Sequence, residues 1–275
     1  MITAIRTYED VQEKINRIFR SGLQIRILIS LGEGTKTLSD LRDITGSSSQ
    51  AILPIIRKME SEHLILSLRT EYSLTPTGKI VYSKVYDCVY TFGILKNQHD
   101  FWLDHFLEGI PTEFLDTIGN LRDSKIIKDT NAEIFQTYAL FLNTVKKARH
   151  IYWITPIMSP GHADAIFCRV PEKIPAELIV TPDVAAQLVS EPFKEKMKSL
   201  EQYQNFSVSV VAEPIKLGLL HTDTSVSLGL YKKDGITFDP YTELISSDAS
   251  ALSWGYEIFQ YYKKRSEPVL FGLGE

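Results

Sequence analysis

Apolar residues recur at helical spacing at the start of the chain. A first amphipathic helix of about 14 residues is predicted, because apolar side chains stand three or four positions apart at Tyr8, Val11, Ile15 and Ile18. A second apolar stretch covers residues 25–31 and ends at the Gly-Glu-Gly sequence of residues 32–34, which is a helix stop signal. This part of the chain therefore predicts two successive helices.

Capping residues predict two further helices. Thr37 precedes Asp40 by three residues, which is the spacing of a capping box, and the short helix that follows ends at Gly46. One of the serines at 47–49 then caps a longer helix. The apolar side of that helix carries Ile52, Ile56 and Met59, and its other side carries Ser49, Gln50, Leu53, Pro54 and Arg57.

The hydrophobic pattern changes after His63. Short apolar segments at 64–68 and 72–74 flank Arg69, which predicts a β-hairpin with a tight tip. Thr75 and Pro76 then begin another helix, because proline is tolerated at the first helical position. Helix, turn, capped helix and hairpin in this order are typical of a winged helix-turn-helix. We therefore expect residues 1–80 to form an α+β winged-helix domain.

A seam of mostly apolar residues follows this domain. Positions 81, 85, 88, 92, 95, 99, 102 and 106 are separated by four and three residues in alternation, like the a and d positions of a heptad. The spacing predicts a linking helix over 81–107, which either pairs with a second copy of the chain or packs within its own chain. In a pairing helix the interface would contain Val85, Cys88, Phe92, Leu95 and Trp102.

Strand-like and helical segments alternate in residues 108–275, which predicts an α/β domain. Strands are predicted at 151–155, 177–181, 206–211, 217–221 and 226–231, and helices at 133–147 and 248–264. Two strands run into Thr-Pro and then a helix. Ligands of open α/β sheets bind beyond such strand ends, near helix N-termini. The predicted contacts of a small polar or anionic ligand are Thr155, Met158, Ser159, His162, Thr181 and Asp183, and the alternative for the hydroxyl residues is plain helix capping.

These segments resemble a known family. The residues that carry the resemblance are Leu38-Ser39-Asp40-Leu41, Thr45-Gly46-Ser47-Ser48 and Tyr72-Ser73-Leu74-Thr75. They resemble archaeal winged-helix regulators of the arsenic-repressor-like kind, in particular those with a methanogenesis-regulatory-protein middle domain. Ser227-Leu228-Gly229-Leu230 and the stretch 251–262 are similar to the end of that middle domain. The resemblance implies a homodimeric, DNA-binding transcriptional regulator with a C-terminal sensor-like domain.

Such a regulator would contact double-stranded operator DNA through the capped helix and the hairpin tip. Ser48 and Ser49 suit phosphates, and Gln50 suits adenine. Arg57 can reach guanine or a phosphate, and Arg69 can reach a minor groove or a phosphate. Leu53 and Pro54 either contact thymine methyls or belong to a packed interface. The alternative class is a winged-helix adaptor that binds proteins of the transcription machinery.

Composition and charge agree with such a protein. The 275 residues are 44% hydrophobic and 23% charged, which is typical of a globular chain of about two domains. Residues 1–85 hold 12 Lys and Arg against 9 Asp and Glu, and the remainder holds 18 against 25, so a basic head precedes an acidic body. The apolar runs are far shorter than a membrane helix, and the N-terminus does not resemble a signal peptide, so a cytoplasmic protein without membrane contact is expected.

No enzymatic activity is expected. The C-terminal pattern also resembles phosphodiesterases of the phospholipase D type, whose chemistry needs a His and a Lys two residues later. His221 is followed by Thr222 and Asp223, and no other histidine has that lysine either. Phosphate loops, nucleophile elbows and helical zinc motifs are also missing. We therefore expect no catalytic residue, metal or cofactor, and a hydrolase with a regulatory head is the remaining alternative.

Overall fold

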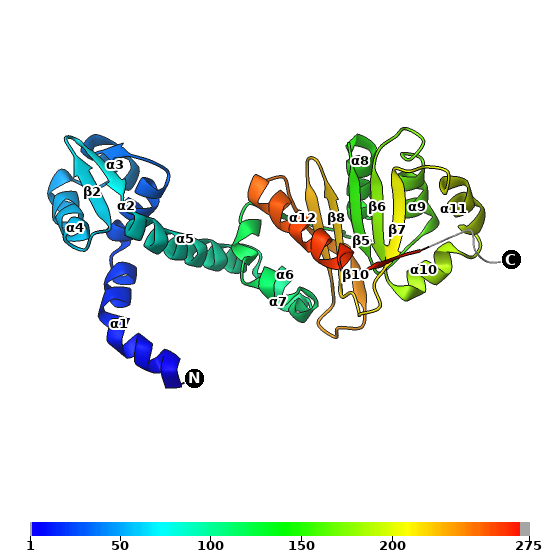
Figure 1. The fold of residues 1–275 in the computed structure, drawn as a ribbon, viewed down its shortest axis with the longest axis horizontal. Coiled ribbons are helices and arrows are strands. Elements are labelled where there is room, and N and C mark those ends of the chain that lie inside the picture. The colour runs from blue at the N-terminus through cyan, green and yellow to red at the C-terminus, as the bar shows by residue number, and fades with distance from the viewer. Residues whose placement is uncertain (1, 270–275) are drawn as a thin grey trace. The chain divides into compact units, whose positions relative to one another are not determined.

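The chain forms two compact units in the computed structural model, which describes residues 2–269. The first unit ends at Val89 and the second begins at Tyr90. The helix α5 (Pro76–Asn97) spans this boundary and so carries residues of both units (Figure 1).

The first unit combines helices with a small sheet. Its helices are α1 (Ile2–Arg20), α2 (Gly22–Gly32), α3 (Leu38–Thr45) and α4 (Ser49–Ser61). Its strands are β1 (Lys36–Thr37), β2 (Ile65–Leu68) and β3 (Glu71–Leu74), which form an antiparallel sheet in the order β1-β3-β2. The predicted order of helices and hairpin is therefore confirmed.

The helices of this unit begin at the predicted caps. The side chain of Thr37 accepts a hydrogen bond from the Asp40 N–H, and the Asp40 carboxylate accepts one from the Thr37 N–H, so the capping box is present. Gly46 ends α3 with φ of 66°, a left-handed conformation that glycine adopts easily. Ser48 caps α4, because its hydroxyl accepts a hydrogen bond from the Ala51 N–H at 3.4 Å.

The core of the first unit lies between α2, α4 and the hairpin. It includes Ile27, Ile52, Ile56, Met59 and Ile65, and α5 contributes Val85 to it. The helix α1 extends away from this core (Figure 1). Its apolar stripe is largely exposed at Ile5, Tyr8, Val11, Ile15 and Phe19. The predicted amphipathic helix is thus present, but most of its apolar side is uncovered within the described chain.

The second unit is built on an eight-stranded mixed sheet in the order β11-β7-β6-β5-β8-β9-β10-β4. The strands are β4 (Lys125–Lys128), β5 (Ile151–Thr155), β6 (Ala176–Val180), β7 (Phe206–Val210), β8 (Leu217–Thr222), β9 (Val226–Tyr231), β10 (Phe238–Ser246) and β11 (Glu267–Pro268). The pairs β5–β6 and β6–β7 are parallel and the others are antiparallel. All five predicted strands are present, whereas β4, β10 and β11 were not predicted.

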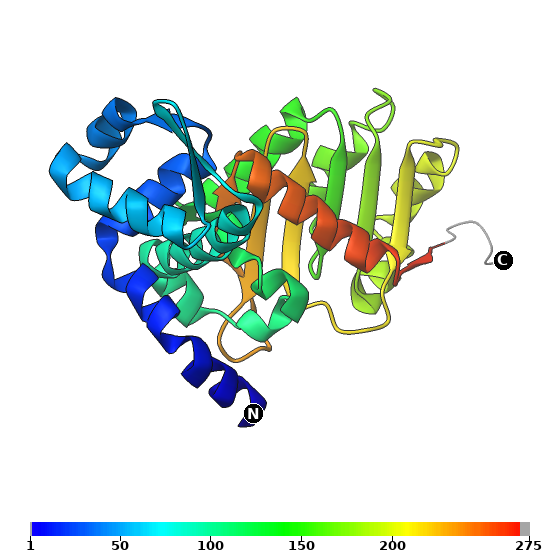
Figure 2. The ribbon, with the colours of Figure 1, turned by 60° about the vertical axis from the view of Figure 1, so that its left-hand side comes forward.

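Helices cover both faces of this sheet (Figures 1 and 2). One face packs against α8 (Gln136–Lys147), α9 (Pro160–Phe167), α10 (Pro182–Leu188) and α11 (Lys194–Leu200). The other face packs against α12 (Ala249–Lys263) and the short helices α6 (His99–Asp104) and α7 (Thr112–Leu115). The central strands are buried on both faces, which explains why they read as continuous apolar runs in the sequence.

The predicted continuous helix over 81–107 is wrong. α5 ends at Asn97, and the next helix, α6, folds back so that the indole N–H of Trp102 donates to the Ile94 carbonyl at 3.0 Å. Val85 is buried in the first unit and Trp102 in the second, so neither is free to meet a second copy. Of the other predicted interface residues, Cys88 is half-buried, and Phe92 and Leu95 are exposed.

Candidate functional sites

The first candidate site is the outer face of α4. Gln50, Pro54 and Arg57 are exposed there, whereas Ser49 and Leu53 are half-buried. Ser48 is exposed at the helix N-terminus, where it serves as the cap. The predicted face therefore exists as one side of one helix, and its polar members are accessible.

The tip of the β2–β3 hairpin is the second part of this surface. Arg69 follows β2 directly, has φ of 57° and is exposed. Within residues 2–269 no ion pair involves Arg57 or Arg69, while Arg17 of the same unit pairs with Glu62. Both cations are thus available to an external anion such as a phosphate.

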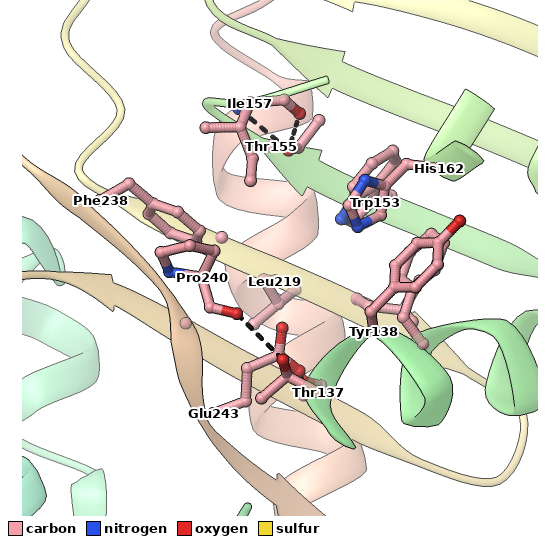
Figure 3. Close-up of a pocket in the computed structure, with 15 residues that line it drawn as sticks. Thr137, Tyr138, Trp153, Thr155, Ile157, His162, Leu219, Phe238, Pro240 and Glu243 are labelled. Carbon is pink, nitrogen blue, oxygen red and sulfur yellow. Dashed lines mark hydrogen bonds between the residues drawn. The ribbon is translucent and has the colours of Figure 1, made fainter. Parts of the chain in front are cut away.

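The third candidate site is a cavity of about 60 Å³ in the second unit (Figure 3). Strands β5, β8, β9 and β10 form its floor, with Thr155, Gly218, Ser227, Gly229 and Glu243 among the lining residues. Its walls are the side chains of α8, α9 and the start of β10, which contribute Thr137, Tyr138, Phe141, His162, Phe238 and Pro240. A site needs about 10–15 Å³ on this measure to hold one water molecule, so the cavity has room for a small group of a few non-hydrogen atoms.

Two glycines shape the floor. Gly218 pairs with Gly229 across β8 and β9, and Gly229 pairs with Glu243 across β9 and β10. A Cβ atom on either glycine would come within 3.0 Å of the Phe238 ring. The missing side chains thus make room for Phe238 against the sheet. Glycine inside a strand often marks such a close approach.

Glu243 is the carboxyl group of this cavity. It accepts a hydrogen bond from the Ser227 hydroxyl of the neighbouring strand. The pKa of Glu243 lies above its ordinary value, mainly because the carboxyl group is buried. The Ser227 hydrogen bond opposes this increase, and the Asp129 carboxylate adds to it. Glu243 therefore holds a proton more tightly than an exposed glutamate does.

His162 stands in the wall of the cavity among aromatic rings. Its ring centroid lies 4.7 Å from that of Phe141, 5.0 Å from that of Tyr138 and 5.8 Å from that of Trp153. Ser159 fixes the ring, since its Oγ lies 2.6 Å from His162 Nδ1. Burial lowers the pKa of His162 below its ordinary value, so the imidazole is neutral near pH 7.

Side chains cap the starts of α8 and α9 beside the cavity. The Asp129 carboxylate accepts hydrogen bonds from the N–H groups of Phe135 and Thr137, both at 2.9 Å, at the start of α8. The Thr137 hydroxyl then donates to the Pro240 carbonyl at 3.0 Å, which ties α8 to β10 (Figure 3). Ser159 accepts from the His162 N–H at the start of α9.

The structure separates the six predicted ligand residues. Thr155 and His162 line the cavity, and Ser159 orients His162. Met158 packs against the apolar core, Thr181 caps α10 by accepting from the Val184 N–H, and Asp183 is exposed. The residues of the two Thr-Pro junctions are therefore not brought together in one site, and Ser159 and Thr181 each cap one helix N–H group. Binding of a polar or anionic ligand stays a prediction.

Sequence reasoning missed Glu243, Ser227, Tyr138 and Phe238. The signal that could have found them is the pair of glycines inside two strands that otherwise read as apolar runs. For residues 2–269, no group of three or more His, Cys, Asp or Glu side chains could hold a metal ion. No helix in that part of the chain is long and apolar enough to cross a membrane.

Comparison with known proteins identifies the family. Two domain models of the methanogenesis regulatory protein FilR1 match the chain, the N-terminal domain over residues 12–91 and the middle domain over residues 134–265. The chain therefore belongs to the FilR1 family, whose domains account for most of its length. The narrower resemblance to arsenic-repressor-like regulators stays a prediction.

A curated relative agrees with this assignment. The methanogenesis regulatory protein FilR1 of Methanothrix harundinacea strain 6Ac is 27% identical over 263 residues, which are 94% of this chain and 59% of the relative. The chain thus spans less than two thirds of that protein. The name of the relative describes a regulatory protein, which agrees with the expected class of this chain.

Solved structures show more distant likenesses. The archaeal chromatin protein TrmBL2 matches with a TM-score of 0.41 and 12% identity, over 95% of this chain and 100% of that one. Nuc, a phospholipase D family member from Salmonella typhimurium, matches with a TM-score of 0.40 and 8% identity, over 54% of this chain and 97% of that one. These likenesses are too remote to assign a function.

Proposed function

We propose that the chain is a transcriptional regulator that binds double-stranded operator DNA through α4 and the β2–β3 hairpin. The observation that carries this proposal is the accessible face of α4, where Gln50 projects next to the capped N-terminus and Arg57 projects further along the same helix. A capped helix of this kind enters a major groove with its N-terminal residues toward the bases. The regulatory family of the chain supports the same function.

Each residue of the face has its own task in this proposal. Ser48 and Ser49 lie at the start of α4, where they meet a phosphate, and Gln50 pairs with an adenine edge. Leu53 and Pro54 contact thymine methyl groups, and Arg57 reaches guanine or a phosphate. Arg69 at the hairpin tip contacts the DNA backbone or a minor groove.

The regulator acts as a homodimer in this proposal, because one recognition helix reads few base pairs and a symmetric operator presents two half-sites. Exposed apolar side chains support a second copy as the partner. Phe92 is 69% exposed on α5, and Leu95 lies three residues further along the same helix. The second unit then senses a small ligand in its cavity, and the ligand acts by favouring one arrangement of the dimer.

Two substitutions test the DNA face. The probe is a DNA fragment selected from a random pool by the parent protein. Gln50→Ala is expected to weaken binding to this fragment by about 1–3 kcal/mol and to relax specificity at one base pair. Arg69→Ala is expected to weaken binding to all sequences and to lower the slope of log affinity against log salt by about one. Fluorescence anisotropy at several salt concentrations measures both effects.

The control is Lys146→Ala, which removes an exposed cation from α8 in the second unit and should leave DNA binding unchanged. Equal DNA binding by the parent and both test variants would contradict the proposed face. A chain that retains a protein partner but selects no DNA would instead be an adaptor.

A further inference from the structure

We propose that the cavity of the second unit binds a small organic cation through the Glu243 carboxylate and the surrounding aromatic rings. The ligand would carry an ammonium group on a short carbon skeleton. Its binding depends only on the cavity, whereas a regulatory effect of binding rests on the proposed sensor function.

The charges around the cavity favour a cation. Glu243 is the carboxyl side chain in the lining, and none of the Lys and Arg residues among residues 2–269 lines the cavity. His162 also lines the cavity, and it carries no positive charge near pH 7. A second carboxylate, Asp129, acts on Glu243 from the end of β4. An anion placed here would meet two carboxyl groups and no compensating cation.

The helix N-termini at this site are partly capped, which weakens the case for an anion. The N–H groups of Phe135 and Thr137 already donate to Asp129, and the His162 N–H donates to Ser159. Helix N-termini bind anions through such N–H groups when these are free. The starts of α8 and α9 are thus partly capped by the chain itself.

The walls of the cavity are unusually aromatic. Tyr138, Phe141, Trp153 and Phe238 all line it, with the Phe141 and Trp153 ring centroids 5.1 Å apart. Aromatic rings attract a cation through the negative charge of their faces, most strongly where water is excluded. Rings together with one carboxylate are the chemistry by which proteins recognise organic ammonium groups.

The volume of the cavity limits the size of the ligand. A volume of about 60 Å³ excludes nucleotides and other large cofactors. The Phe238 ring fills the space above Gly218 and Gly229, so the ligand has to fit between this ring and the walls from α8 and α9. An ammonium group with a few carbon atoms is of that size.

A proton and a bound cation would compete for Glu243. Burial raises the pKa of Glu243, and a bound cation favours the ionised carboxylate. Affinity for the cation should therefore rise with pH until Glu243 is fully ionised even when the cavity is empty. The titratable groups nearby are Asp129 after β4, which acts on Glu243, and His162 of α9 and Tyr138 of α8, which line the same cavity. Protonation of His162 at low pH would act in the same direction, by repelling the cation.

Three two-carbon probes of similar size test the inference on the full chain: ethylammonium, ethanol and acetate. Isothermal titration calorimetry should detect ethylammonium and neither of the other two. Glu243→Gln keeps the shape of the side chain and removes its charge, so it should weaken ethylammonium binding by at least about tenfold, or about 1.4 kcal/mol. The same variant should also lose the increase of affinity with pH.

Glu257→Gln is the matched control, because Glu257 is exposed on α12 and lies outside the cavity. Circular dichroism of Glu243→Gln checks that the variant is folded. If Glu243→Gln does not fold, Phe141→Leu provides a second test, since it removes a ring and keeps the carboxyl group. Binding of acetate, ethylammonium binding that neither variant weakens, or no ethylammonium binding below about 10 mM would overturn the inference.

The DNA-binding proposal fails or succeeds separately. If Gln50→Ala binds ethylammonium as the parent does and Glu243→Gln does not, the cavity is the binding site of ethylammonium, whatever the DNA results are. Bound ethylammonium that leaves the affinity for DNA unchanged would contradict only the sensor role.

Discussion

His221 is the most strongly perturbed histidine outside the cavity. It lies in β8, where its Nε2–H donates to the Leu252 carbonyl at 3.0 Å and its Nδ1 lies 3.3 Å from His150 Nε2. Burial, and to a smaller extent the neighbouring His150, lower the pKa of His221 to about 4. The ring is therefore neutral in the folded protein and accepts a proton easily only after unfolding.

The stability of the protein should consequently depend on pH. The unfolded chain binds a proton at His221 below about pH 6.5, whereas the folded chain does so only near pH 4. The contribution is fully present above pH 6.5 and is lost as the pH falls toward 4. Urea unfolding across this range should show a smaller pH dependence for His221→Gln than for the parent. His63→Gln changes an exposed histidine and should retain the parent dependence; equal slopes for all three proteins would contradict the prediction.

The residues of the cavity differ in how far the sequence predicts them. Thr155 and His162 are predictable, because a strand that runs into Thr-Pro and a helix is a local pattern. Glu243 is not, because its place depends on the pairing of β10 with Gly229 and on a register shift between Phe238 and Glu243. Such a shift depends on tertiary packing, which no local spacing of residues specifies.

The start of α5 requires a glycine. A Cβ atom at Gly78 would lie 1.9 Å from the Leu64 carbonyl oxygen, which is backbone and cannot turn away. Gly93 is on the same helix and has nothing within 4 Å of its Cβ position. Two glycines of one helix therefore have opposite packing environments.

Substitution by alanine should separate the two positions. Gly78→Ala should destabilise the first unit by about 1–3 kcal/mol or more, because the first turn of α5 has to move away from Leu64. Gly93→Ala should be neutral or stabilise by up to about 1 kcal/mol, since alanine favours helix. Denaturant unfolding followed by circular dichroism measures both. A Gly78→Ala protein as stable as Gly93→Ala would show that this contact is absent.

Whole elements were predicted best where a local signal begins or ends them. The capping box at Thr37 and the cap at Ser48 placed α3 and α4 correctly, because capping depends on residues three positions apart. The break after Asn97 was missed, because heptad spacing continues through it and no glycine or proline marks it. β10 was missed as well, since Pro240 and charged residues interrupt its apolar pattern.

At the scale of the whole molecule, the proposed dimer can be tested at one exposed ring. Phe92→Glu places a charge on the apolar face of α5 and should convert the dimer to folded monomers, because an unpaired charge is costly in a desolvated interface. Sedimentation equilibrium measures the mass, and Ile236→Glu is the control, because Ile236 is an exposed apolar residue of the β9–β10 connection. A folded Phe92→Glu dimer would place the contact elsewhere, for example on the exposed side of α1.

The two outer strands of the large sheet limit how copies of this protein can associate. β4 carries lysines at both ends, Lys125 and Lys128, and β11 is two residues long and contains Pro268, which has no N–H to donate. Within residues 2–269, neither edge is a good template for adding a strand from another molecule. The large sheet is thereby protected against edge-to-edge aggregation and amyloid-like growth.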